Sequence, residues 1–165
     1  MKSFEIKTKI FFGEQALDHL KEIPYRKVLI ITDPFVVQSG MIRMITNPME
    51  EAGITYDVFK EVVPDPPIDK ISLGVKKMLS YKPEAIVAVG GGSAMDVAKC
   101  IKLYAPMSDD VCYLEQPYVD TGIPLIALPT TAGTGSETTL AAVITDGQTH
   151  HKYAKYYFAE NFYKY

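Results

Sequence analysis

Short apolar runs alternate with stretches of helical periodicity, and this alternation limits the fold more than any other feature of the sequence. The apolar runs cover residues 27–33, 54–59, 85–89 and 123–128. A single helix ending at Ala52 is expected after the first run, and further helices are expected over 68–81 and 93–104. Helices that connect strands in this order give right-handed βαβ units and a mostly parallel sheet. The sequence therefore predicts an α/β, Rossmann-like fold with helices on both faces of the sheet.

Three connecting segments have simpler patterns. Residues 4–12 alternate between charged and apolar side chains, which predicts a half-exposed strand or strand pair. Residues 14–23 predict a short helix. Residues 63–67 hold three prolines and predict a stiff connection, because proline fixes its φ angle and cannot donate to a sheet.

Composition narrows the class of protein. The 165 residues carry a formal net charge of −3, which provides no basic field for nucleic acid or for an anionic membrane. Apolar runs of the length of a membrane span, about 18 residues, do not occur. Cys100 and Cys112 are too far apart for a Cys-x-x-Cys motif, which favours two reduced thiols in a cytoplasmic protein.

Three glycines, Gly90, Gly91 and Gly92, separate the third apolar run from the helix that follows it. The segment matches neither the dinucleotide pattern Gly-x-Gly-x-x-Gly nor the P-loop. It would nevertheless bring backbone N–H groups and the positive end of a helix to an anion. Ser93 is positioned to cap the helix, with Asp96 three residues later as in a capping box. A sharp turn and a phosphate-binding loop both remain open at this point.

Two further polar sites follow parallel strands. Residues 127–139 read ALPTTAGTGSETT, and this loop presents many hydroxyl groups at the same sheet edge as the glycines. Asp33 ends the first apolar run, where a carboxylate could accept hydrogen bonds from ribose hydroxyls and repel a 2′-phosphate. Asp33 could equally cap the helix after it, as the Asp-Pro dipeptide suggests. Ligands bind beyond the carboxyl ends of strands in such sheets, so this edge is the expected site.

The residues at this edge resemble those of the iron-containing (group III) alcohol dehydrogenases. Residues 87–99, VAVGGGSAMDVAK, are similar to the pyrophosphate loop of that family, and residues 128–137, LPTTAGTGSE, to its second cofactor loop. Shorter matches lie at 12–14, 64–66 and 143–146. The resemblance implies an NAD-binding domain, corresponding to the N-terminal half of a dehydroquinate synthase-like fold, joined to an all-helical metal domain.

The resemblance also implies roles for single residues. Gly91, Gly92 and Ser93 would hold the pyrophosphate, and Asp96 would lie toward the nicotinamide. The adenosine and phosphate path would be lined by Thr130, Thr131, Thr134 and Thr139. Lys152 would reach a cofactor ribose, and Asp33 would favour NAD over NADP.

The resemblance does not extend to the metal. The family holds Fe²⁺, or Zn²⁺ in some relatives, with one aspartate and three histidines of the helical domain. The sequence has only His19, His150 and His151, and the last two are adjacent, so on a strand they would point to opposite faces. We therefore expect no metal ligand and no catalytic residue in this chain, and no alcohol oxidation by it alone.

The expected organisation is a cofactor domain over residues 1–152 and an aromatic-rich tail over 153–165, with the metal domain absent. The resemblance implies a cytoplasmic homodimer, joined through its N-terminal strands, that acts on a small alcohol or aldehyde. Two alternatives remain: a self-standing nucleotide-binding module without redox activity, and a zinc-dependent relative of the glycerol dehydrogenase type. The threonine-rich loop favours the alcohol dehydrogenase branch.

Overall fold

Four parallel strands form the central sheet of the computed structural model, which describes residues 8–108, 113, 116, 119–139, 141–145 and 152–156. The strands are β1 (Lys27–Thr32), β2 (Thr55–Phe59), β3 (Ala85–Gly90) and β4 (Leu125–Pro129), in the spatial order β2-β1-β3-β4. All three pairings are parallel. The predicted α/β fold with a parallel sheet is confirmed.

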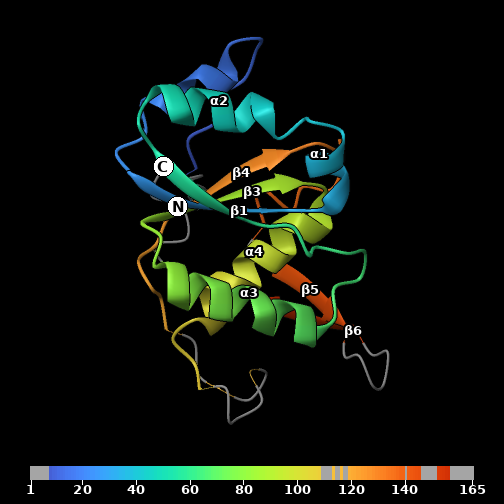
Figure 1. Cartoon of the computed structure of the whole chain (residues 1–165). Helices are drawn as coiled ribbons and strands as arrows, with labels where there is room; N and C mark the ends of the chain where they lie inside the picture. The colour runs from blue at the N-terminus through green and yellow to red at the C-terminus, as the bar shows by residue number, and fades with distance from the viewer. Residues whose placement is uncertain are drawn as a thin grey trace, which may run out of the picture.

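Helices cover both faces of this sheet, as Figure 1 shows. One face carries the 3₁₀ helix η1 (Ala16–Lys21), α1 (Pro34–Gln38) and α2 (Arg43–Glu51), and the other carries α3 (Ile68–Tyr81) and α4 (Gly92–Tyr104). Successive strand residues point to opposite faces. Val28 and Ile30 therefore pack under α1 and α2, whereas Leu29 and Ile31 pack against α3 and α4. Because both faces are covered, β1 and β3 are continuous apolar runs.

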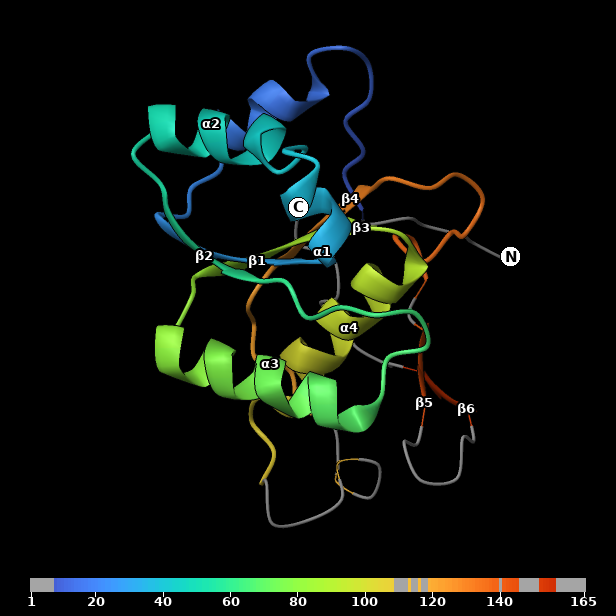
Figure 2. The ribbon, with the colours of Figure 1, turned by 45° about the vertical axis from the view of Figure 1, so that its right-hand side comes forward.

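A separate antiparallel pair joins β5 (Ala141–Thr145) to β6 (Lys152–Tyr156). Figure 2 shows this pair beside α4, away from the main sheet. The backbone N–H of Val143 in β5 donates to the Asp96 carboxylate of α4, and Thr145 forms a bridge to Pro67. The hairpin thus connects α4 to the proline-rich connection before α3.

Three predicted elements differ in the structure. Residues 8–12 form no strand, and residues 1–7 lie outside the described part of the chain. The predicted helix over 14–23 is the 3₁₀ helix η1. The single helix before Ala52 is two helices, because α1 ends at Gln38, with Ser39 as its C-cap, and Gly40 follows with a φ of 79°. A left-handed glycine ends a helix readily, since it has no Cβ to clash with the backbone.

Gly74 is the point of close contact between α3 and α4. A Cβ built on it would lie 2.2 Å from Cδ1 and 2.7 Å from Cγ1 of Ile101, which is fully buried. Gly74→Ala should therefore destabilise the protein by about 1–3 kcal/mol despite alanine's better helix propensity. Denaturant unfolding measures the change in the free energy of unfolding. Adding Ile101→Val to Gly74→Ala removes Cδ1 and should restore part of the lost stability. A Gly74→Ala protein as stable as wild type would contradict the close packing.

Candidate functional site

The carboxyl ends of β1, β3 and β4 meet at one edge of the sheet. The chain runs from β1 outward to β2 and then returns to β3 on the other side of β1, so the strand order reverses between β1 and β3. Ligands bind at such switch points in open α/β sheets. Asp33 follows β1, Gly90 ends β3 and Pro129 ends β4, with Gly90 and Pro129 paired in register. The sheet therefore brings together the three segments that the sequence predicted to lie side by side.

The three glycines have three different backbone roles. Gly90 has a φ of 143°, and a Cβ there would lie 2.8 Å from the Ala94 Cβ. Gly91 is the N-cap of α4 with an extended backbone, and Gly92 is the first helical residue. Since the cap has no side chain, the N–H groups of Gly92 and Ser93 have no capping side-chain oxygen, whereas the Ala94 N–H donates to the Gly91 carbonyl.

The predicted capping box is wrong. Ser93 lies inside the first turn of α4 rather than at its cap, and no side chain caps the helix. Asp96 does not reach back to that turn, because both of its oxygens accept hydrogen bonds from elsewhere. Ser136 Oγ donates to Oδ1 over 2.5 Å and the Val143 backbone N–H to Oδ2 over 3.0 Å.

The threonine-rich loop lies close against the glycines. A Cβ added to Gly91 would lie 3.1 Å from Thr131 Oγ1, and one added to Gly92 would lie 3.6 Å from the Thr134 side chain. Both threonines are exposed. Thr130 continues the sheet edge, since its N–H donates to the Gly90 carbonyl over 2.9 Å. This junction, the slot, has the bare backbone of Gly91 and Gly92 on one side and threonine side chains on the other, at about van der Waals separation.

Asp33 caps the short helix after β1. Its Oδ1 accepts the Val36 N–H at 3.0 Å, and Pro34 occupies the first helical position. The helix-cap interpretation is therefore confirmed. Its second oxygen, Oδ2, faces the glycine turn, 3.3 Å from where a Gly90 Cβ would lie. The carboxylate thus lies beside the slot while its other oxygen caps α1.

A buried ammonium group fastens the threonine-rich loop to α4. Lys99 is 1% exposed, and its Nζ donates to the Ala141 carbonyl at 2.7 Å, Ser136 Oγ at 3.1 Å and Thr139 Oγ1 at 3.3 Å. Asp96 Oδ1 lies 3.5 Å from the same nitrogen. Burial lowers the pKa of Lys99 from its ordinary value, and the neighbouring Asp96 charge opposes that shift.

Sequence reasoning missed Lys99 and Ser136. The one signal in the sequence was the spacing of Asp96 and Lys99, which places a charged pair on one side of a largely apolar helix. Thr139, predicted to line the cofactor path, accepts a hydrogen bond from Lys99. The structure describes Lys152 in an exposed ion pair with Asp65 at 2.7 Å, rather than at the slot.

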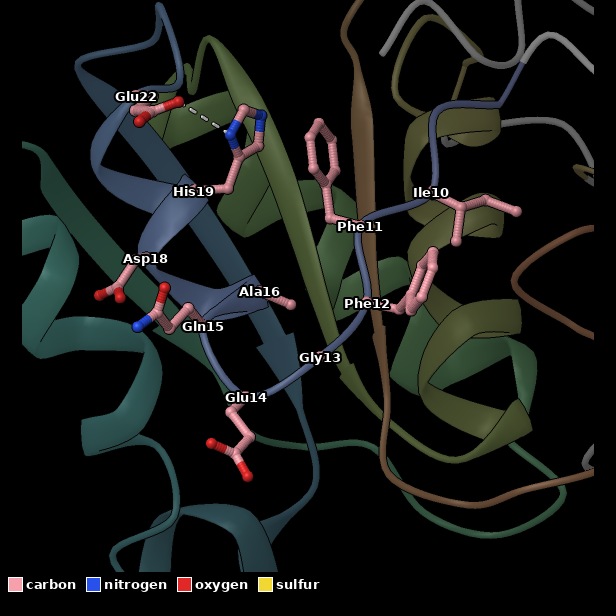
Figure 3. A pocket seen from close by; sticks show the side chains of 10 residues that line it. All are labelled: Ile10, Phe11, Phe12, Gly13, Glu14, Gln15, Ala16, Asp18, His19 and Glu22. Carbon is pink, nitrogen blue, oxygen red and sulfur yellow. Dashed lines mark hydrogen bonds and ion pairs between the residues drawn. The ribbon is translucent and has the colours of Figure 1, made fainter.

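A separate hollow lies at the N-terminal segment and contains none of the predicted site residues. Figure 3 shows Phe11 beside His19, whose Nδ1 is 3.1 Å from Glu22 Oε2. The Phe11 and His19 rings stack with centroids 3.7 Å apart. The hollow is lined entirely by residues 10–22. It does not extend to the glycine loop.

Within the described residues, no group of three or more His, Cys, Asp or Glu side chains could hold a metal ion. The described residues therefore do not fit an iron or zinc site. His150, His151 and Cys112 lie outside the described residues, and Cys100 is buried. No helix in the described part of the chain is both long and apolar enough to span a bilayer.

A parallel sheet with a glycine turn and an uncapped helix start at its switch point defines a nucleotide-binding class of α/β protein. The sequence comparisons identify the family within that class. Residues 7–162 match the family model of iron-containing alcohol dehydrogenase, and the chain belongs to that family. The resemblance found in the sequence is confirmed.

Curated relatives include lactaldehyde reductase of Escherichia coli strain K12, 35% identical over 151 residues, and choline dehydrogenase of Bacillus subtilis strain 168, 37% identical over 160 residues. These matches cover 87% and 92% of this chain but 40% of each relative. The chain thus spans about two fifths of the length of these relatives.

Solved structures agree with the family assignment. An iron-containing alcohol dehydrogenase from Thermococcus thioreducens has a TM-score of 0.84 at 26% identity, covering 94% of this chain and 44% of that one. Sulfoacetaldehyde reductase from Bifidobacterium kashiwanohense, solved in complex with NAD⁺, has a TM-score of 0.82 at 27% identity, covering 99% and 44%.

Proposed function

We propose that the chain is the cofactor-binding part of an NAD-dependent alcohol dehydrogenase of the iron-containing type, which interconverts a small alcohol and its aldehyde. The observation that carries the proposal is the slot between Gly91–Gly92 and the side chains of Thr131 and Thr134. A pyrophosphate needs close approach to backbone N–H groups, and a side chain at Gly91 or Gly92 would take up that space.

Each part of the slot has a chemical task in this proposal. The N–H groups at the start of α4 and the hydroxyls of Thr131 and Thr134 would donate to the pyrophosphate oxygens. Asp33 would accept from the adenosine ribose hydroxyls through the oxygen that does not cap α1. Lys152 would reach a ribose only after leaving Asp65, and two exposed charges separate at little cost. Bound NAD supplies the hydride acceptor or donor.

Calorimetric titration of the 165-residue chain with NAD⁺ and NADH tests the proposal directly. We expect saturable binding at one site per chain, with hydrogen exchange slowed at the start of α4 and in residues 130–139. A folded chain that binds neither form of the cofactor would contradict the assignment.

Asp33→Asn should relax the preference for NAD over NADP. Asparagine caps a helix as well as aspartate does, so α1 stays capped while the charge that would repel a 2′-phosphate is removed. We expect the NADP affinity to rise about tenfold, as removal of roughly 1.4 kcal/mol of repulsion implies. Parallel titrations with NAD⁺ and NADP⁺ measure the ratio. If the wild type already prefers NADP⁺, Asp33 serves only as a cap.

We also propose a cytoplasmic homodimer that uses the N-terminal segment. The support is a run of exposed apolar side chains, of which Phe12 is 90% exposed and Ile10 64%. Phe12→Lys should shift the protein toward monomer in sedimentation velocity. Leu79→Lys, at a half-exposed position on α3, is the matched control and should leave the assembly unchanged. Equal sedimentation of both variants and the wild type would exclude this surface.

A further inference from the structure

Lys99 and Lys102 are both buried in α4, and the hydrogen bonds of Lys99 reach the threonine-rich loop. Lys99 is 1% exposed and Lys102 is 3% exposed. Lys102 Nζ lies 3.4 Å from Asp120, on a different segment. Burying a charge is costly unless the charge is paired and hydrogen-bonded. The hydrogen bonds of the Lys99 ammonium to the loop therefore have to offset this cost.

The contacts of Lys99 converge on the segment that forms one wall of the slot. Ser136 is the only buried residue of 130–139, and it accepts from Lys99 while donating to Asp96. Lys99 also holds the end of the same loop through Thr139 and the Ala141 carbonyl. Asp96 in turn accepts from Val143 in β5. Lys99 and Asp96, one turn apart in α4, thus hold the loop at Ser136 and Thr139 and the start of β5 after it.

The same loop carries the hydroxyl wall. Thr131 and Thr134 are exposed, and Ser136 lies two residues beyond Thr134, with its N–H donating to Thr134 Oγ1 at 3.3 Å. Ser136 also lies near the glycine side, since its Cβ is 3.9 Å from where a Gly92 Cβ would be. The position of Ser136 therefore determines where the Thr134 side chain lies opposite Gly92.

We propose that Lys99 is a positioning residue for cofactor binding: its ammonium, with Asp96, clamps Ser136 and thereby fixes the width of the slot between the glycine loop and the threonine-rich loop. Lys99 does not touch the cofactor in this inference, which rests on the proposed function. A loop held in its bound conformation loses less entropy when the cofactor binds.

Lys99→Met is the main test, because methionine has similar length and no charge. We expect the NAD⁺ dissociation constant to rise at least about tenfold, the equivalent of one lost well-placed interaction of 1.4 kcal/mol. Hydrogen exchange of residues 130–139 without cofactor should become faster. Lys102→Met is the matched control: it removes a buried ammonium from the same helix and should leave both the affinity and the loop exchange unchanged.

Ser136→Ala provides a second variant in case Lys99→Met fails to fold. It removes the clamped hydroxyl and keeps the Lys99–Asp96 pair, so the affinity should again fall. The double variant should bind no more weakly than Lys99→Met alone, because both changes break one connection. Unchanged affinity in folded Lys99→Met, or in Ser136→Ala where only that variant folds, would overturn the inference. So would equal losses in Lys99→Met and Lys102→Met. A wild type that does not bind NAD⁺ would instead refute the proposed function.

Discussion

Gly92→Val is expected to remove most of the NAD affinity and to leave the fold intact. Gly92 is the first residue of α4 and its φ is not positive, so a side chain is compatible with its backbone. A Cβ there would make ordinary contacts, 3.6 Å from Thr134 and 3.9 Å from Ser136. The branched side chain would nevertheless extend into the slot between the two loops. A substitution at Gly92 should therefore lower the NAD affinity without lowering the folding stability.

The expected loss is about 2 kcal/mol or more, if even two charge-assisted hydrogen bonds to the pyrophosphate fail to form. Calorimetry gives the affinity, and denaturant unfolding of the same preparation gives the stability. Gly92→Ala is the graded control, and its affinity should fall between those of wild type and valine. Wild-type affinity in a well-folded Gly92→Val protein would mean that no pyrophosphate lies at this backbone.

The sequence predicted which segments meet at the sheet edge better than it predicted their contacts. Continuous apolar runs are specific enough to predict the strands of a sheet that is covered on both faces. The carboxyl ends of parallel strands lie at the same edge of the sheet, so Asp33, the glycines and the threonines were expected to meet there. Which glycine makes the turn depends on φ, which the residue type does not reveal. The turn is at Gly90, whereas Gly92 is the first residue of α4 and packs against Thr134, and this difference also removes the cap predicted for Ser93.

Local sequence patterns could not predict the contacts between segments that are far apart in the chain. The spacing of Asp96 and Lys99 indicates a pair on one helix, but their other partners, Ser136 and Val143, are some forty residues away and come from a loop and an unpredicted strand. The ion pair between Lys152 and Asp65 could not be predicted from local sequence patterns either. This pairing depends on a bridge between β5 and the proline-rich connection, and no local pattern encodes that bridge.

Gly90→Ala should have the opposite effect to Gly92→Val: a loss of folding stability rather than a specific loss of binding. The φ of 143° at Gly90 is one that residues with a Cβ rarely adopt, and the added Cβ would lie 2.8 Å from the Ala94 Cβ and 3.3 Å from Asp33 Oδ2. Backbone strain and overpacking each cost about 1–3 kcal/mol, so a total of about 3 kcal/mol or more is expected.

Denaturant unfolding measures this loss, and a second substitution divides it into its two causes. Gly90→Ala combined with Ala94→Gly removes the steric overlap but keeps the strained φ, and it also adds the cost of a helix glycine, about 1 kcal/mol. Ala94→Gly alone gives that last cost directly. If the double variant recovers stability beyond this correction, the contact with Ala94 contributes to the requirement for glycine; if it recovers none, the backbone conformation alone imposes it. A Gly90→Ala protein as stable as wild type would show that β3 does not end in this turn, and the slot built upon the turn would then have to be placed elsewhere.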